Sequence, residues 1–223
     1  MTYLLPILGV LISFAFVFLV KPQNKENFKL LLAFSGAFLL ALTIFELFPS
    51  VYEESNSKTV GVFVMLGILL QIFLEFFSKG AEHGHVHLDS EKSDFPWLLF
   101  LSLSVHSFLE GFPIENHNAI IYGILIHKIP IAIILSIFLL NSKIKLANAL
   151  FFIVLFSLMT PLGSYVAANF EFATKYYVPI TALVIGVFLH ISTVILFEST
   201  EGHKFNLRKL MVIVLGIVIA YVL

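Results

Sequence analysis

Long apolar stretches separated by short polar interruptions run the length of the chain. Each stretch holds few charged residues and is close to the ~20 residues that a helix needs to cross the hydrocarbon core of a bilayer. The apolar residues are continuous within each stretch and do not alternate with polar ones, which is typical of membrane helices and not of barrel strands. The pattern predicts eight membrane-spanning helices, at about 1–20, 28–49, 59–78, 95–113, 118–140, 145–168, 178–197 and 207–223.

The composition supports the same fold class. Hydrophobic residues make up 59% of the chain and charged residues only 12%, against roughly 25% charged in an ordinary soluble domain. The 13 Lys and Arg residues are scattered and form no basic face, so nucleic-acid binding is not expected. The absence of cysteine excludes disulfides, thiolate zinc sites and thiol catalysis. We therefore expect an all-α integral membrane protein whose residues 1–223 form one transmembrane domain, with its function inside the helix bundle.

The basic residues between the predicted helices are distributed unequally. Cytoplasmic loops are enriched in Lys and Arg, and ten such residues fall in alternate loops whereas Lys58 and Lys175 alone fall on the opposite side. This predicts that both termini lie outside the cytoplasm and that the loop 79–94 is cytoplasmic. A multi-pass protein of the cell membrane is expected; a bacterial inner membrane and a eukaryotic plasma or organelle membrane all fit the sequence. The ten residues are Lys21, Lys25, Lys29, Lys79, Lys92, Lys143, Lys145, Lys204, Arg208 and Lys209.

Ionisable residues inside the predicted spans indicate where the function lies. A charge at the bilayer centre costs ~2.5–3.5 kcal/mol on insertion scales, so such residues usually serve a function. His106 and Glu110 are four residues apart, which places both side chains on one face of the fourth helix. His127 and Lys128 lie on the fifth helix, which runs antiparallel to the fourth. Two neighbouring helices thus each bring a histidine to a similar depth, a pattern that favours a site for one divalent ion.

Proline and glycine occur inside several spans. A broken helix is tolerated at membrane depth where neighbouring helices or a water-lined cavity satisfy the freed carbonyl groups, and transporters have such helices near their sites. Simple kinks that serve helix packing are the alternative interpretation. The residues concerned are Pro6, Pro130, Pro161, Gly163 and Gly186.

Several motifs in chain order resemble those of one family. The runs His106-Ser-Phe-Leu-Glu-Gly111 and His127-Lys-Ile-Pro130 resemble the paired HSxxEG and HKxP signatures on the fourth and fifth helices of ZIP (Zrt/Irt-like) divalent-metal transporters. The run Leu74–Phe77 with the following histidines resembles the family's third helix and cytoplasmic histidine loop. Met159–Gly163 resembles the TPLG turn of its sixth helix, and Gly186–Leu189 the GTFL segment of its seventh.

The resemblance implies a fold, a site and a mode of action. It implies an eight-helix ZIP bundle in which helices 1–3 and 6–8 form an inverted repeat, a homodimer in the lipid bilayer, and alternating access by an elevator-like movement. It further implies that His106, Glu110 and His127 are the metal ligands of a transporter that moves divalent cations toward the cytoplasm. No prosthetic group is expected, because the metal is the transported ion.

Departures from the family pattern change the expected site. Binuclear members have Asn after the first histidine and acidic residues on the fifth helix, where this chain has Ser107, Lys128 and Ile131. A single-metal site is expected, with the Lys128 ammonium in place of a second ion. Three side-chain ligands leave positions open for water. Two imidazoles and one carboxylate suit Zn²⁺ or Fe²⁺ better than Ca²⁺ or Mg²⁺, and the ligands do not decide among Zn²⁺, Fe²⁺, Mn²⁺ and Cd²⁺.

Other polar residues of the spans and of the loop 79–94 are weaker candidates. Glu46 either lies on the metal path or reaches the interface from a helix end. His190 is a candidate for the exit path, and Gln71 with Glu75 on the third span are interpreted as helix-packing contacts. The cytoplasmic trio is either a loose metal-capturing loop or a solvated linker, and it consists of His83, His85 and His87.

Two further functions stay open. An intramembrane metal-dependent hydrolase also needs buried His and Glu, but no span contains HExxH and no nucleophile accompanies a base, so we do not expect an enzyme. The second is a carrier of another solute in which the His, Glu and Lys residues form a structural network between two helices.

Overall fold

The computed structural model describes residues 3–22, 25–78, 95–114, 119–198 and 207–223, and in these ranges it contains helices and no strands. A π-helical segment, η1, joins α2 to α3, and a short 3₁₀ turn, η3, follows α5. The elements are α1 (Leu4–Val20), α2 (Lys25–Leu42), η1 (Thr43–Leu47), α3 (Phe48–Glu54), α4 (Ser57–Ser78), α5 (Trp97–Glu110), η3 (Phe112–Ile114), α6 (Ile120–Asn141), α7 (Leu146–Asn169), α8 (Glu171–Lys175), α9 (Tyr177–Glu198) and α10 (Leu207–Val222).

The long helices coincide with the predicted apolar stretches to within a few residues, except that α2 continues through η1 and α3 to Glu54. Among the described residues, six helical segments are long and apolar enough to cross a membrane. The helix α1 is apolar but shorter, with 17 residues, and α10 has 16. The one-turn helix α8 was not predicted. The six segments are Asn27–Glu54, Ser57–Ser78, Trp97–Ile114, Ile120–Asn141, Leu146–Asn169 and Tyr177–Phe197.

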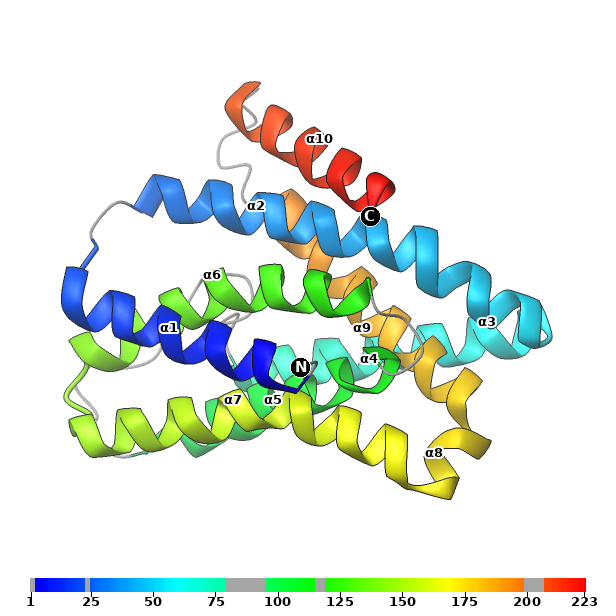
Figure 1. Ribbon diagram of the computed structural model, residues 1–223, viewed down its shortest axis with the longest axis horizontal. Coiled ribbons are helices and arrows are strands. Elements are labelled where there is room, and N and C mark those ends of the chain that lie inside the picture. Colours follow the sequence, from blue (N-terminus) through cyan, green and yellow to red (C-terminus); the bar gives the residue numbers. More distant parts are fainter. Residues whose placement is uncertain (1–2, 23–24, 79–94, 115–118, 199–206) are drawn as a thin grey trace.

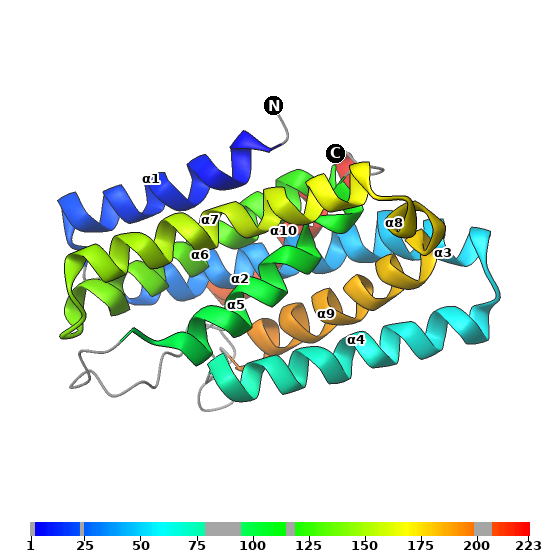
Figure 2. The same cartoon turned by 90° about the horizontal axis from the view of Figure 1, so that it is seen from below.

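The helices form two packed groups. In one group α1 packs against α6 and α7, and α5 packs against α7. In the other, α2 packs against α9 and α10, and α4 packs against α9. Figure 1 shows α10 along α2 at one margin of the bundle, and Figure 2 shows α4 beside α9 on the side away from α1. Contacts of α2 with α6 and of α4 with α5 join the two groups.

Each group has its own apolar core, and α6 contributes to both. Ile124 and Ile131 belong to the core that α2, α4 and α9 share. One residue further along, Ala132 belongs to the core that α1, α5 and α7 share. His127 and Lys128 therefore lie near the point where α6 passes from one core to the other.

Glycine allows two pairs of helices to meet backbone to backbone. A Cβ atom on Gly67 of α4 would overlap the carbonyl oxygen of Leu183 in α9, and one on Gly186 would overlap that of Val64. Gly111, just after α5, and Gly163 in α7 approach each other in the same way. Small residues permit this close approach in membrane bundles, so Gly163 and Gly186 serve helix packing here.

The helices are not broken at the internal prolines that the sequence singled out, because α6 is continuous through Pro130 and α7 through Pro161. The irregular turn lies instead at η1, where the N–H of Phe48 donates to the carbonyl of Thr43, five residues earlier. Pro49 follows at once. Proline has no N–H and its ring crowds the carbonyl four residues before it, and a wider turn at this point relieves that crowding.

The outer surface of the bundle is apolar. On α4, large side chains such as Met65, Phe73 and Phe76 are more than half exposed. In water such a surface would be unfavourable, whereas lipid accepts it because every backbone polar group is satisfied inside a helix. The described helices thus present the face that a bilayer requires.

Candidate metal site

The last turns of α5 carry three polar side chains into the interior. His106, Ser107 and Glu110 are all at most 2% exposed. The turn is fixed against α7, because Gly111 meets Gly163 there and the hydroxyl of Thr160 donates to the Ser107 carbonyl at 2.9 Å. Four-residue spacing places His106 and Glu110 on one helical face, as predicted, and their Nε2 and Oε1 atoms are 2.8 Å apart.

Lys128 reaches across from α6 to the same carboxylate. Its Nζ donates to Glu110 Oε2 at 2.5 Å and to the Ser107 hydroxyl at 2.8 Å. The ammonium also lies 5.0 Å from the ring centroid of Phe156 on α7, within the range of a cation–π contact. Removing one partner of a buried ion pair typically costs 3–5 kcal/mol, so Lys128 and Glu110 depend on each other.

His127 completes the group from α6. It is fully buried, and its ring centroid lies 6.3 Å from that of His106 with the planes at 79°. One donor atom from each of His106, Glu110 and His127 can be chosen so that all three lie within 4.8 Å of one another. Donor atoms on a tetrahedral zinc ion are about 3.4 Å apart. Side-chain rotations that bring the three atoms together by roughly an ångström would therefore form three corners of such a site.

The chemistry of this group is that of an open metal site. Two imidazole nitrogens and one carboxylate oxygen are the ligands that Zn²⁺ has in sites that keep a position for water. At the position where binuclear relatives have a further carboxylate, the buried Ile131 supplies no ligand. With Lys128 already paired to Glu110, the described side chains provide for one divalent ion and a fixed positive charge beside it.

The structure places the remaining candidates outside this group. Glu46 lies in η1 and is partly buried. His190 on α9 meets Glu75 on α4, with Nε2 and Oε2 2.7 Å apart, so Glu75 is the interhelical contact that the sequence predicted. The fully buried amide of Gln71 has no hydrogen-bond partner among the described residues, which departs from the packing contact expected. His83, His85 and His87 lie outside the described residues.

Sequence reasoning missed two supports of the site. Phe156 beneath the lysine is one of 25 phenylalanines, and nothing in the pattern separates it from the others. Thr160 falls inside the Met159–Gly163 motif, so a signal was present, but that motif does not show that the hydroxyl would bond to the neighbouring helix.

Comparisons with known proteins point the same way as the site. The chain is 39% identical to zinc transporter ZIP1 of Danio rerio over 93 aligned residues, which include 38% of this chain and 30% of the zebrafish protein. The chain thus matches less than a third of that relative's length. The sequence model of the ZIP zinc transporter family matches residues 79–223, which hold α5 to α10 and all three candidate ligands. The family consists of transporters and not enzymes, and this chain, an integral membrane protein of apolar helices, belongs to the ZIP zinc transporter family.

Proposed function

We propose that the protein carries divalent metal cations, Zn²⁺ foremost, across a membrane toward the cytoplasm, and that His106, Glu110 and His127 hold the cation on its way. One observation carries the proposal. Donor atoms from two helices come within 4.8 Å of one another in the interior of an apolar bundle, where ionisable side chains are costly unless they serve a function. Fe²⁺, Mn²⁺ and Cd²⁺ accept the same ligands and are further candidate cargo.

Transport requires a site that releases its ion, and the geometry favours release. Three protein ligands leave the rest of the coordination shell to water, which exchanges readily. Lys128 adds a positive charge at the position where binuclear relatives would place a second ion, and Ser107 helps to hold it there. The bound cation is repelled by this charge, so binding is weakened without the loss of any ligand.

Glu46 and His190 are proposed to lie on the path of the cation. Glu46 lies within the π-helical segment η1, and such segments are often functional positions. His190 and Glu75 offer a nitrogen and an oxygen ligand between α4 and α9. We further propose that His83, His85 and His87 of the loop 79–94 capture metal on the cytoplasmic side and modulate transport.

The proposed topology is one transmembrane domain of eight spans over residues 1–223, with both termini outside the cytoplasm. The ten-to-two distribution of Lys and Arg supports this orientation. The helix contacts support the inverted repeat. An inverted repeat of the predicted spans exchanges α1 with α7, α2 with α9, α4 with α10, and α5 with α6. This exchange relates the contact of α1 with α6 to that of α7 with α5. It also relates the contact of α2 with α10 to that of α9 with α4, and both members of each pair are found.

Alternating access is proposed to move the two helix groups relative to each other, with the site on the group that contains α5 and α6. The separate apolar cores of the two groups support such a movement. A homodimer in the cell membrane is proposed from the family resemblance.

Uptake of Zn²⁺ by liposomes that contain the purified protein tests the proposal. The parental protein should accumulate Zn²⁺, and His106→Ala should lose roughly tenfold or more of the rate because one of three ligands is gone. Ser136→Ala is the matched control, since Ser136 is a fully buried polar residue of α6 whose hydroxyl donates to the Ala132 carbonyl of the same helix. Competition by Fe²⁺, Mn²⁺ and Cd²⁺ in the same assay ranks the cargo.

A structural network of His, Glu and Lys would give a different result. In that case His106→Ala would unfold at a lower temperature but carry Zn²⁺ at the parental rate per folded molecule. That outcome would remove His106 from the metal site.

A further inference from the structure

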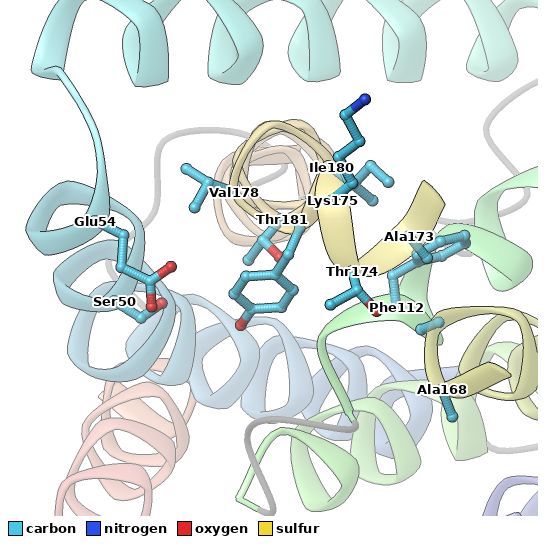
Figure 3. A pocket seen from close by; sticks show the side chains of 12 residues that line it. Ser50, Glu54, Phe112, Ala168, Ala173, Thr174, Lys175, Val178, Ile180 and Thr181 are labelled. Atoms are coloured by element: carbon cyan, nitrogen blue, oxygen red, sulfur yellow. The ribbon is translucent and has the colours of Figure 1, made fainter. Parts of the chain in front are cut away.

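A cavity of about 690 Å³ opens at the end of the bundle where α3 and α8 lie. This end is opposite to the one where α4 ends at Ser78 and α5 begins at Trp97, and it is predicted to face away from the cytoplasm. Figure 3 shows side chains of α3 on one wall, the start of α9 in the middle and α8 with the end of α7 on the other side. The proposed function assigns no role to this cavity.

The cavity reaches the segment that carries the buried site. Phe112, which forms part of its wall, is two residues beyond Glu110. The Phe112 ring is 7% exposed and packs edge to face on Phe108 of α5, with ring centroids 5.4 Å apart. His106, Glu110 and His127 are at most 2% exposed. The cavity thus reaches the segment just after Glu110, but none of the three buried candidate ligands lines it.

Most polar side chains of the wall offer oxygen atoms as ligands. Glu54 supplies a carboxylate, and Ser50, Thr174 and Thr181 supply hydroxyls; Figure 3 shows Ser50 and Glu54 together on the α3 wall. No histidine is among the lining residues in the part of the chain that the structure describes. A set of oxygen donors with one carboxylate suits a cation that keeps most of its water. Six waters at about 30 Å³ each need roughly 180 Å³, so the cavity has room for a hydrated ion.

Thr181 gives an independent indication that this wall has a ligand. It is fully buried, and its hydroxyl has no hydrogen-bond partner among the described residues. Buried hydroxyls are nearly always paired, with protein or with ordered water. A hydroxyl that lines a cavity and is left unpaired by the protein is therefore placed to bond to whatever enters.

Lys175 also lines the cavity and would repel a cation if its ammonium pointed inward. Its Nζ lies instead 5.5 Å from the ring centroid of Tyr176, and Figure 3 shows the end of the side chain directed away from Glu54 and Ser50. The negative charge of Glu54 thus dominates the part of the wall that faces Thr181.

We propose that this cavity binds a hydrated divalent cation through Glu54, with Ser50 and Thr181 bonding to its water shell, before the ion enters the buried site. The inference rests on the proposed transport function for its biological meaning, but cation binding in the cavity is measurable by itself.

Terbium luminescence measures this binding without any transport. Tb³⁺ prefers oxygen ligands, as other hard cations do, and the lining residue Tyr177 is close enough to transfer excitation to it. In detergent the parental protein should give Tyr-sensitised Tb³⁺ emission that Zn²⁺ displaces. Glu54→Gln should raise the Kd for Tb³⁺ by about tenfold, because one charge at ~6 Å from the ion is lost.

One variant is the matched control. Glu53→Gln removes the same charge from an exposed neighbour that does not line the cavity. It should keep the parental Kd. Tyr177→Phe should lower the emission and leave the Kd unchanged.

An unchanged Kd in Glu54→Gln, an equal loss in Glu53→Gln, or failure of Zn²⁺ to displace Tb³⁺ would overturn the inference. The proposed function has a separate readout. If liposomes take up no Zn²⁺ while Tb³⁺ binding depends on Glu54, the proposed transport function is refuted and the cavity site is supported. If uptake is normal and Glu54→Gln leaves Tb³⁺ binding unchanged, only the cavity site is refuted.

Discussion

Lys128→Met is the substitution that separates binding from release most clearly. Methionine keeps the length and apolar character of the lysine stem and removes the ammonium that bonds to Glu110 at 2.5 Å and to Ser107 at 2.8 Å. The carboxylate then stays buried without its partner, and a bound Zn²⁺ no longer meets a positive charge.

The size of the effect follows from the geometry. A zinc ion bound to Glu110 Oε1 at about 2 Å would lie about 5 Å from the ammonium on Oε2. Charges of +2 and +1 at that separation repel by roughly 7 kcal/mol at an effective dielectric constant of 20. Relaxation and water reduce this figure, yet a quarter of it exceeds the ~1.4 kcal/mol that changes a Kd tenfold. We expect KM for Zn²⁺ to fall by about tenfold or more, and kcat to fall as well because release slows.

Initial rates of Zn²⁺ uptake into liposomes give both parameters. Lys209→Met is the matched control, because Lys209 is a buried lysine of α10 whose Nζ donates to the Leu196 carbonyl at 2.7 Å, outside the site. Thermal unfolding in detergent gives a second readout. Metal-free Lys128→Met should lose about 3–5 kcal/mol of stability, and Zn²⁺ should restore most of it. A KM at or above the parental value in Lys128→Met would refute the reasoning.

Two further predictions concern pH and packing. Zn²⁺ uptake should slow as external pH falls, because His106, His127 and Glu110 bind metal only when deprotonated; initial rates at fixed free Zn²⁺ that rise steadily on acidification would contradict Glu110 as a ligand. Gly67→Ala should destabilise the protein by about 1–3 kcal/mol, because the added Cβ meets the α9 backbone. Gly61→Ala on the same helix meets nothing within 4 Å and should be neutral or stabilising. Equal unfolding temperatures of the two glycine variants would argue against the backbone contact.

The grouping of the candidate ligands was predictable because it depends on spacing within one helix and on a short link to the next helix. Four-residue spacing fixes His106 and Glu110 on one face whatever the rest of the fold does. A short link to the next apolar stretch makes α6 antiparallel to α5, which brings His127 to a similar depth. The two motifs on these helices indicated the ZIP family, and the family match over residues 79–223 confirmed that assignment.

Features that depend on packing between distant segments were not predictable. The sequence marks Lys128 as an intramembrane cation beside the site but does not show that its ammonium bonds to both Glu110 and Ser107. The prolines Pro130 and Pro161 left broken helices or simple kinks as alternatives, and the helices are not broken there. The irregular turn lies instead at η1, just before Pro49. There the wider turn relieves the crowding between the proline ring and the carbonyl four residues earlier. The cavity at the end of the bundle where α3 and α8 lie is lined by residues from five elements. No single stretch of sequence therefore predicts it.

All three proposed ligands belong to α5 and α6, within the group of helices that packs around α1 and α7. If that group moves as a unit, the three ligands and the bound ion move together, and every metal–ligand distance stays unchanged. Travel by itself would then not loosen the ion. Its departure would depend on water that fills the open ligand positions at either end and on repulsion by the Lys128 ammonium, which moves with the site.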